Sequence, residues 1–169
     1  MKARVTLRPV VMALCALAAS YAAVTPAGAA DPFGIALPMQ QQASGNYYVT
    51  GTLSGVVRAD FLVDTGSGYV SLSPATFAQL KSLPGTEFQR VIVGSMANGH
   101  ALKVRVYRVD RLALGEHCVL RDVEVAVMPG ASRDILGLSA LRRVAPFAMN
   151  LETPALLLSG CDAPLAAAH

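Results

Sequence analysis

Apolar and polar residues alternate along most of this chain from Asn46 onward, and that alternation constrains the fold more than any other feature. A period of two places the apolar side chains on one face of a β-strand, whereas a helix needs a period of about 3.6. Turn signals at Ser54-Gly55 and Asn98-Gly99 separate alternating runs. The pattern predicts strands over 47–53, 57–63, 69–72, 88–93, 102–114, 119–128, 147–150 and 155–158, with a further edge strand within 35–39.

Helical signals are few. Ser73 is a good helix cap and Pro74 suits the first helical position, so a short helix is expected from Pro74 to Lys81. A second short helical stretch is expected over 139–143. The chain is therefore expected to be all-β with one or two short helices, in a barrel or a sandwich.

The N-terminal segment has the features of a secretory signal. Three basic residues precede an apolar run over 10–19, and Ala27-Gly28-Ala29 supplies the small residues that a signal peptidase requires. We expect residues 1–30 to be a cleaved signal peptide and the protein to be periplasmic or secreted. The alternative is an uncleaved anchor, although a membrane span needs about 20 apolar residues.

Charge and organisation of the remaining chain exclude some functions. The sequence has 14 Lys and Arg, three of them in the signal, and 11 Asp and Glu, none of them there, so the rest is neutral. This balance argues against a nucleic-acid partner. We expect a lead-in over 31–45, a domain over 46–159, a flexible tail over 160–169, and no membrane span once the signal is removed.

Two cysteines, Cys118 and Cys161, follow the signal. An oxidising compartment favours a disulfide between them. Two unpaired thiols are the alternative, because the sequence gives no distance.

Asp64 is the acid whose position calls for an explanation. It follows the apolar run Phe61-Leu62-Val63 and precedes Thr65-Gly66-Ser67-Gly68, a turn of small residues and hydroxyls. Burying a carboxylate is costly unless it is hydrogen-bonded. Position alone leaves two interpretations, a functional carboxylate and an Asp that caps its own turn.

Residues 61–67 resemble the hydrophobic-hydrophobic-Asp-Thr-Gly-Ser signature of aspartic peptidases. Ile135-Leu136-Gly137 resembles their second signature, and Ala97-Asn98-Gly99 stands where they have a flap hairpin. Order, spacing and length over about 46–159 are similar to the retropepsin-like peptidases, particularly bacterial envelope members. The resemblance implies a closed β-barrel with a flap hairpin and half an active site per chain.

The resemblance also implies a mechanism. Two adjacent carboxylates share one proton; the ionised one takes a proton from a water, and the protonated one donates to the scissile carbonyl. No cofactor and no metal is required. A single Asp-Thr-Gly implies a homodimer in which Asp64 of each protomer meets at the two-fold axis.

Supporting roles follow by resemblance. Thr65 would lock the two loops together across the dimer, the Gly66 amide would face the carboxylate, and Ser67 would contact its outer oxygen. Ala97, Asn98 and Gly99 would close over an extended polypeptide substrate. The loop would be supported from beneath by Leu62, Ile135, Leu136 and Gly137.

Two positions depart from the retroviral pattern, which has an acid where this chain has Gly68 and an Arg where it has Leu138. The ion pairs that link the active site to the dimer interface in those relatives are therefore missing, which bears on the dimer's geometry.

Other polar residues carry weaker signals. The four acids Asp60, Asp110, Asp122 and Asp134 are expected to be turn or surface residues. The histidines His100, His117 and His169 lack the spacing of metal ligands.

The sequence thus favours an aspartic endopeptidase. One alternative is a catalytically silent module of the same fold that binds a peptide or protein partner. Another is a structural module in which Asp64 only caps a turn.

Overall fold

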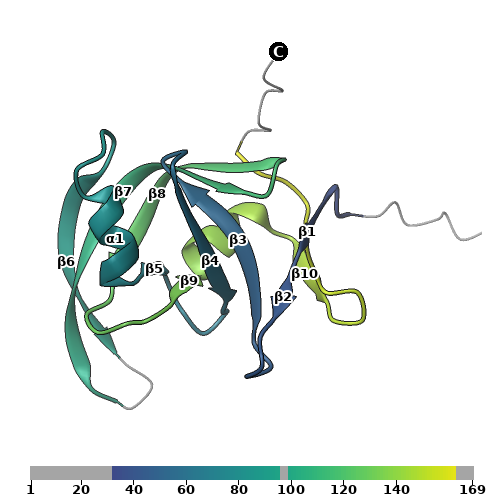
Figure 1. Ribbon diagram of the computed structural model, residues 1–169, viewed down its shortest axis with the longest axis horizontal. Helices are drawn as coiled ribbons and strands as arrows, with labels where there is room; N and C mark the ends of the chain where they lie inside the picture. Colours follow the sequence, from purple (N-terminus) through teal and green to yellow (C-terminus); the bar gives the residue numbers. More distant parts are fainter. Residues whose placement is uncertain (1–31, 96–98, 163–169) are drawn as a thin grey trace, which may run out of the picture.

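The computed structural model describes residues 32–95 and 99–162 of the chain. The expected signal peptide and most of the expected tail lie outside these residues. Two sheets and three short helical segments make up the described part (Figure 1). The elements are β1 (Ile35–Pro38), β2 (Gln40–Gln41), β3 (Tyr47–Leu53), β4 (Val57–Val63), β5 (Val70–Leu72), α1 (Pro74–Leu80), β6 (Glu87–Ser95), β7 (Ala101–Leu114), β8 (Cys118–Val127), β9 (Asp134–Leu136), α2 (Leu138–Leu141), the 3₁₀ helix η1 (Arg142–Val144), β10 (Phe147–Asn150) and β11 (Ala155–Leu158).

The larger sheet closes on itself as a barrel. Its strand order is β2-β3-β4-β9-β5-β8-β7-β6, and a further pairing of β3 with β7 joins Gly51 to Leu114 and Leu53 to Leu112. This pairing closes a ring of six strands and leaves β2 and β6 outside it. The expectation of an all-β barrel with short helices is confirmed, and the sandwich is excluded.

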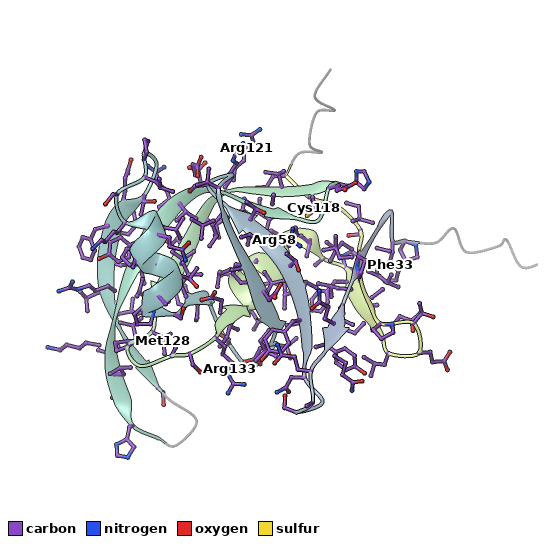
Figure 2. All side chains as sticks on the ribbon, viewed as in Figure 1. Phe33, Arg58, Cys118, Arg121, Met128 and Arg133 are labelled. Carbon is purple, nitrogen blue, oxygen red and sulfur yellow. A yellow bond between two sulfur atoms is a disulfide. The ribbon has the colours of Figure 1, made fainter. Side chains whose placement is uncertain are left out.

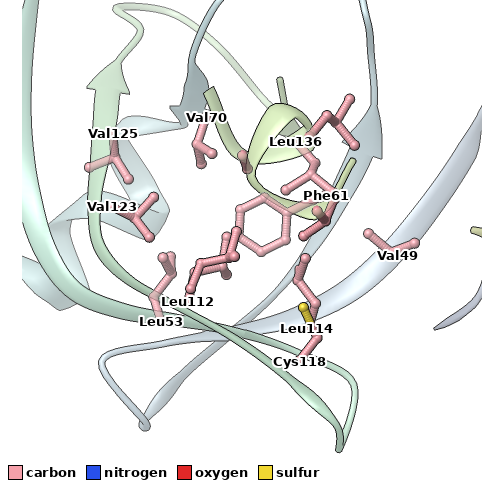
Figure 3. Close-up of a cluster of buried hydrophobic side chains, with 14 of the residues drawn as sticks. Val49, Leu53, Phe61, Val70, Leu112, Leu114, Cys118, Val123, Val125 and Leu136 are labelled. Carbon is pink, nitrogen blue, oxygen red and sulfur yellow. The ribbon is translucent and has the colours of Figure 1, made fainter. Parts of the chain in front are cut away.

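The barrel interior is filled by the apolar residues of the alternating pattern. Phe61 lies at its centre and is fully buried, with Leu53, Leu112 and Leu136 around it (Figure 3). A Cβ at Gly51 would come within 2.9 Å of the Phe61 ring and 3.1 Å of the Ala113 carbonyl oxygen. A larger residue at that position would therefore push β3 away from β7.

Strand β9 was not expected from the sequence. It pairs in parallel with β4, with Leu62 opposite Ile135 and Val63 opposite Leu136, and antiparallel with β5, with Ser71 opposite Ile135. The connection from β4 to β5 therefore passes over the end of β9. We call this connection, residues 64–69, the Asp64 loop.

The smaller sheet has the order β1-β11-β10, so the first and last described strands pair within one chain. Beside it, a disulfide joins Cys118 to Cys161, with 5.4 Å between their Cα atoms. The Arg143 guanidinium also forms an ion pair with Asp162. These contacts tie the end of the domain to the barrel. None of the helices in the described part of the chain is long and apolar enough to cross a membrane.

Candidate active site

The Asp64 carboxylate is held by the backbone of its own loop. The Gly66 amide donates a 2.8 Å hydrogen bond to Oδ1 of Asp64, and the Ser67 amide donates to the Asp64 carbonyl at 3.3 Å. The Asp64 amide in turn donates to the Leu136 carbonyl at 3.2 Å. The carboxylate therefore stands at the junction of β4 and β9, half-buried, with Oδ1 engaged.

The start of α2 fixes the loop from beneath. The Leu138 amide donates to the Ser67 carbonyl at 2.8 Å, and the Ser139 amide donates to the Gly68 carbonyl at 3.0 Å. The Ser139 hydroxyl accepts a 2.9 Å hydrogen bond from the Val70 amide. Two positions of the loop and the first residue of β5 are thereby bound to two residues of one helical turn.

Gly137 lies directly under the Asp64 loop, and no side chain fits there. A Cβ would collide with the Tyr69 carbonyl oxygen and lie 2.7 Å from the Ser67 carbonyl oxygen. The structure thus places Ile135-Leu136-Gly137 beneath the loop.

The two hydroxyl groups of the Asp64 loop, on Thr65 and Ser67, differ in their hydrogen bonding. Ser67 Oγ donates to the Tyr69 carbonyl at 2.9 Å, so it stabilises the turn, and no hydrogen bond joins it to Asp64. The expected contact between Ser67 and the outer carboxylate oxygen is therefore not seen. Thr65 is exposed, and within the described residues its hydroxyl has no hydrogen-bond partner.

A cleft of about 600 Å³ opens beside the carboxylate. Asp64 and Ser67 line one side of it, and Ile92, Val104 and Ala126 line the apolar side. Met128 and Arg133, near the two ends of the β8–β9 connection, also line the cleft and are labelled in Figure 2. The apolar wall belongs to a second small core cluster on β6, β7 and β8.

The expected flap corresponds to the hairpin of β6 and β7. The two strands pair as far as Ser95 opposite Ala101, and Gly94 and Ser95 border the cleft. Gly99 is exposed and has φ +81°, a conformation that favours glycine. Ala97 and Asn98 lie outside the described residues.

An ion pair between β6 and β8 contacts Tyr69, one of the residues that line the cleft. The Arg90 guanidinium of β6 contacts Glu124 of β8 at 2.5 and 2.7 Å, and it donates to the Tyr69 hydroxyl at 3.2 Å. The hydrogen bonds from Arg90 lower the pKa of Glu124, and those to Glu124 and Tyr69 raise the pKa of Arg90. Tyr69, the last residue of the Asp64 loop, is thereby connected to the hairpin.

The expectation of a turn or surface acid is wrong for Asp134, which is only 6% exposed. Its Oδ1 accepts a 2.7 Å hydrogen bond from the Ser73 amide, and its Oδ2 accepts one of 2.6 Å from the Thr76 hydroxyl. The Ser73 hydroxyl also accepts from the Thr76 amide and caps α1. The position of the acid directly before Ile135 was the available signal.

The other three acids, Asp60, Asp110 and Asp122, are exposed as expected. Over residues 32–95 and 99–162, no group of three or more His, Cys, Asp or Glu side chains could hold a metal ion.

Comparisons with known proteins agree with this geometry. The sequence model of the family described as "gag-polyprotein putative aspartyl protease" matches residues 49–143, more than half of the chain, a range that includes Asp64 and Gly137. Among matching solved structures is the crystal structure of a retropepsin-like aspartic protease from Rickettsia conorii. It has a TM-score of 0.52 and 18% sequence identity, over 73% of this chain and 89% of that chain, and so shows the fold. No curated protein matches the chain at a significant level.

Proposed function

Because the chain belongs to the retropepsin-like family of aspartic proteases, we propose that it is an endopeptidase that hydrolyses peptide bonds within extended polypeptide segments. The observation that carries the proposal is the state of the Asp64 carboxylate. Its Oδ1 is held by the Gly66 amide, its Oδ2 has no hydrogen-bond partner in the described part of the chain, and Asp64 lines the cleft. A carboxylate presented in this way is available to a water and a substrate carbonyl.

The chemistry needs a second carboxylate, because one group cannot be both general base and general acid in the same step. Each chain supplies one Asp-Thr-Gly, so we propose that Asp64 of a second copy completes the site. Two carboxylates that close cannot both ionise, and the pair shares one proton. The ionised member then activates the water, and the protonated member donates to the scissile carbonyl oxygen.

The cleft suits an extended substrate. An extended peptide can pair its backbone with strand edges and place alternate side chains in pockets. The β6–β7 hairpin borders the cleft on one side, and the apolar wall of Ile92, Val104 and Ala126 would accept apolar side chains near the scissile bond.

We further propose that the protein acts outside the cytoplasm, in the periplasm or after secretion. The sequence of residues 1–30 has the features of a signal peptide. The disulfide between Cys118 and Cys161 supports the same location, because such bridges persist mainly in oxidising compartments.

The test is cleavage of a peptide library between pH 3 and 7 by the purified protein, beside Asp64→Asn and Asp60→Asn. We expect cleavage by the wild type and by Asp60→Asn, whose exposed carboxylate is bound to Thr50 outside the cleft. We expect none by Asp64→Asn, which keeps the shape of the side chain and loses the charge. Cleavage by Asp64→Asn at the wild-type rate would refute the proposal. Binding of peptides without cleavage at any pH would instead identify a silent module.

A further inference from the structure

We propose that Arg133 selects substrates with an acidic side chain, so that the protein cleaves extended segments in which a glutamate or aspartate lies within about three residues of the scissile bond. This inference rests on the proposed function and deepens it, because it names the chemical class of polypeptide that the cleft accepts. It depends on the charge of one residue in the cleft and not on how two copies associate.

The lining of the cleft carries little charge. Among the described residues, the charged ones that border it are Asp64 and Arg133, and the others are apolar, small or hydroxyl-bearing. Asp64 takes part in the proposed reaction itself. Arg133 is therefore the charge that a substrate side chain meets, and a cation attracts an acidic side chain and repels a basic one.

The guanidinium of Arg133 is available for such a contact. Arg133 is exposed, and within residues 32–95 and 99–162 no hydrogen bond or ion pair engages its side chain. It also borders a second, polar cavity of about 510 Å³, which Asp60 and Asp134 help to line. Those carboxylates are bound elsewhere, Asp60 by the Thr50 hydroxyl at 2.7 Å and Asp134 by the cap and first turn of α1. A substrate carboxylate would therefore not have to displace a partner from Arg133.

The cations Arg90, Lys103 and Arg105, on the hairpin strands that wall the cleft, do not supply this charge. Arg90 forms hydrogen bonds with both carboxylate oxygens of Glu124. Lys103 and Arg105 border a different cavity, of about 330 Å³, together with residues of α1. They alternate along β7 with Val104, which borders the cleft, so they lie on the opposite face of the hairpin.

The backbone on both sides of Arg133 is fixed. The Ala131 amide donates to the Met128 carbonyl at 3.2 Å and closes a turn just before it. Asp134, directly after it, is buried and bound to α1. A charge carried on a fixed segment has a defined reach, which selection among substrates requires.

The register of β4 and β9 indicates where along a substrate this charge acts. Val63 lies opposite Leu136, and Asp64 follows directly after that pair. Arg133 precedes Leu136 by three positions, which at about 3.3 Å per residue separates its backbone from the junction by about 10 Å. An extended substrate advances by the same distance per residue, so the acidic side chain is expected within about three residues of the scissile bond.

The two sides of the cleft thus differ in chemistry. The wall formed by Ile92, Val104 and Ala126 is apolar, whereas Arg133 lies at the β9 end of the β8–β9 connection (Figure 2). An extended segment can place an apolar side chain against the wall and an acidic one beside Arg133. If Asp64 of a second copy completes the site, the second Arg133 provides the same contact on the other side of the scissile bond.

The first test is cleavage, above about pH 5 where glutamate is ionised, of short neutral peptides in which one position near the cleaved bond carries Glu, Gln or Lys. We expect the wild type to cleave the best Glu peptide with a kcat/KM about fivefold above that of the matched Gln peptide, and the Lys peptide more slowly still. Arg133→Gln should cleave the Glu and Gln peptides equally, and Arg133→Glu should prefer the Lys peptide.

Two further variants serve as controls. Arg105→Gln removes the same charge outside the cleft and should keep the wild-type preference for Glu. Arg133→Lys keeps the charge and should retain most of that preference. Equal cleavage of the Glu and Gln peptides by the wild type would overturn the proposal. A preference for Glu that Arg133→Gln retains, or that Arg105→Gln loses to the same extent, would overturn it as well.

Peptide binding separates failure of this proposal from failure of the proposed function. The affinity of the Asp64→Asn protein for the same Glu and Gln peptides can be measured by fluorescence anisotropy at about pH 6. Binding of the Glu peptide that is about fivefold tighter, and that loses this advantage when Arg133→Gln is added, would support the acidic selectivity even if the wild type cleaved no peptide. Cleavage that depends on Asp64 without any difference between the Glu and Gln peptides would refute only the role of Arg133.

Discussion

The Thr76 hydroxyl donates a 2.6 Å hydrogen bond to Oδ2 of Asp134, and this bond joins helix α1 to strand β9. The other carboxylate oxygen accepts from the Ser73 amide at 2.7 Å, so one buried acid binds both the cap and the first turn of the helix. Two residues further along β9, Leu136 accepts the hydrogen bond from the Asp64 amide. Asp134 therefore anchors the strand that positions the candidate catalytic residue.

Replacement of Asp134 by Ala should leave the Ser73 amide and the Thr76 hydroxyl without their buried acceptor. Hydrogen bonds to charged groups contribute about 1.5–3 kcal/mol, and we expect a loss of free energy of unfolding in this range in urea. Asp60→Asn, which changes an exposed acid, should shift the free energy of unfolding by less than about 0.5 kcal/mol. Equal effects of the two substitutions would show that the buried network has no special role.

Gly137→Ala should displace the Asp64 loop, because the added Cβ would meet the carbonyl oxygens of Tyr69 and Ser67. Overpacking of this kind costs about 1–3 kcal/mol, measurable by thermal or urea unfolding. Peptide cleavage should fall as well. Gly160→Ala is the control, because its Cβ meets no atom within 4 Å. A Gly137→Ala protein as stable as this control would contradict the predicted collision.

Reduction of the disulfide between Cys118 and Cys161 should lower stability. The bridge joins residues 43 positions apart. In the loop-entropy treatment, closing a loop of this size raises the free energy of the unfolded chain by about 4 kcal/mol. We expect a fall in the melting temperature of the wild type on addition of a reductant. The Cys118→Ala/Cys161→Ala variant should have a lower melting temperature that does not change on addition of the reductant. A wild-type melting temperature that is unchanged by the reductant would exclude a stabilising bridge.

The ion pair of Arg90 and Glu124 should stabilise the fold in a pH-dependent way. Its hydrogen bonds lower the pKa of Glu124 in the folded state. The stabilisation is therefore present above the unfolded pKa of the glutamate and is lost as the pH falls through the lower folded value. Both groups are substantially exposed, so the effect should be small and weakened by salt.

A double-mutant cycle with Arg90→Gln and Glu124→Gln, measured by urea unfolding, would detect this coupling. We expect a favourable coupling at pH 7 that is smaller at pH 3 and in 1 M salt. A coupling that grew on acidification would show that the carboxylate is not the stabilising partner.

Much of the fold was predictable because its information is local. The alternating residues of 47–53 and 57–63 correspond to β3 and β4 as the structure has them, and the cap at Ser73 marks the start of α1. Strand β9 was missed because three residues are too few to show a period. Closure of the barrel depends on contacts such as Gly51 with Leu114, which no local pattern encodes.

The candidate site was predictable only in part, for a similar reason. The motif around Asp64 identifies the loop, but burial of Asp134 depends on Ser73, 61 residues earlier in the chain. The hydrogen bond of Ser67 to Tyr69 is likewise a property of the folded turn. The apolar wall of the cleft exists because β6, β7 and β8 lie side by side.

The pairing of β1 with β11 inside one chain has a kinetic consequence. Each copy completes its own terminal sheet, so folding does not have to wait for a partner, and folding and association become separate events. If association completes the site, dilution alone keeps the protein latent. Below the dissociation constant of the dimer, the rate of peptide hydrolysis should then rise with the square of the protein concentration. Activation would be controlled by the local concentration of copies rather than by removal of an inhibitory segment.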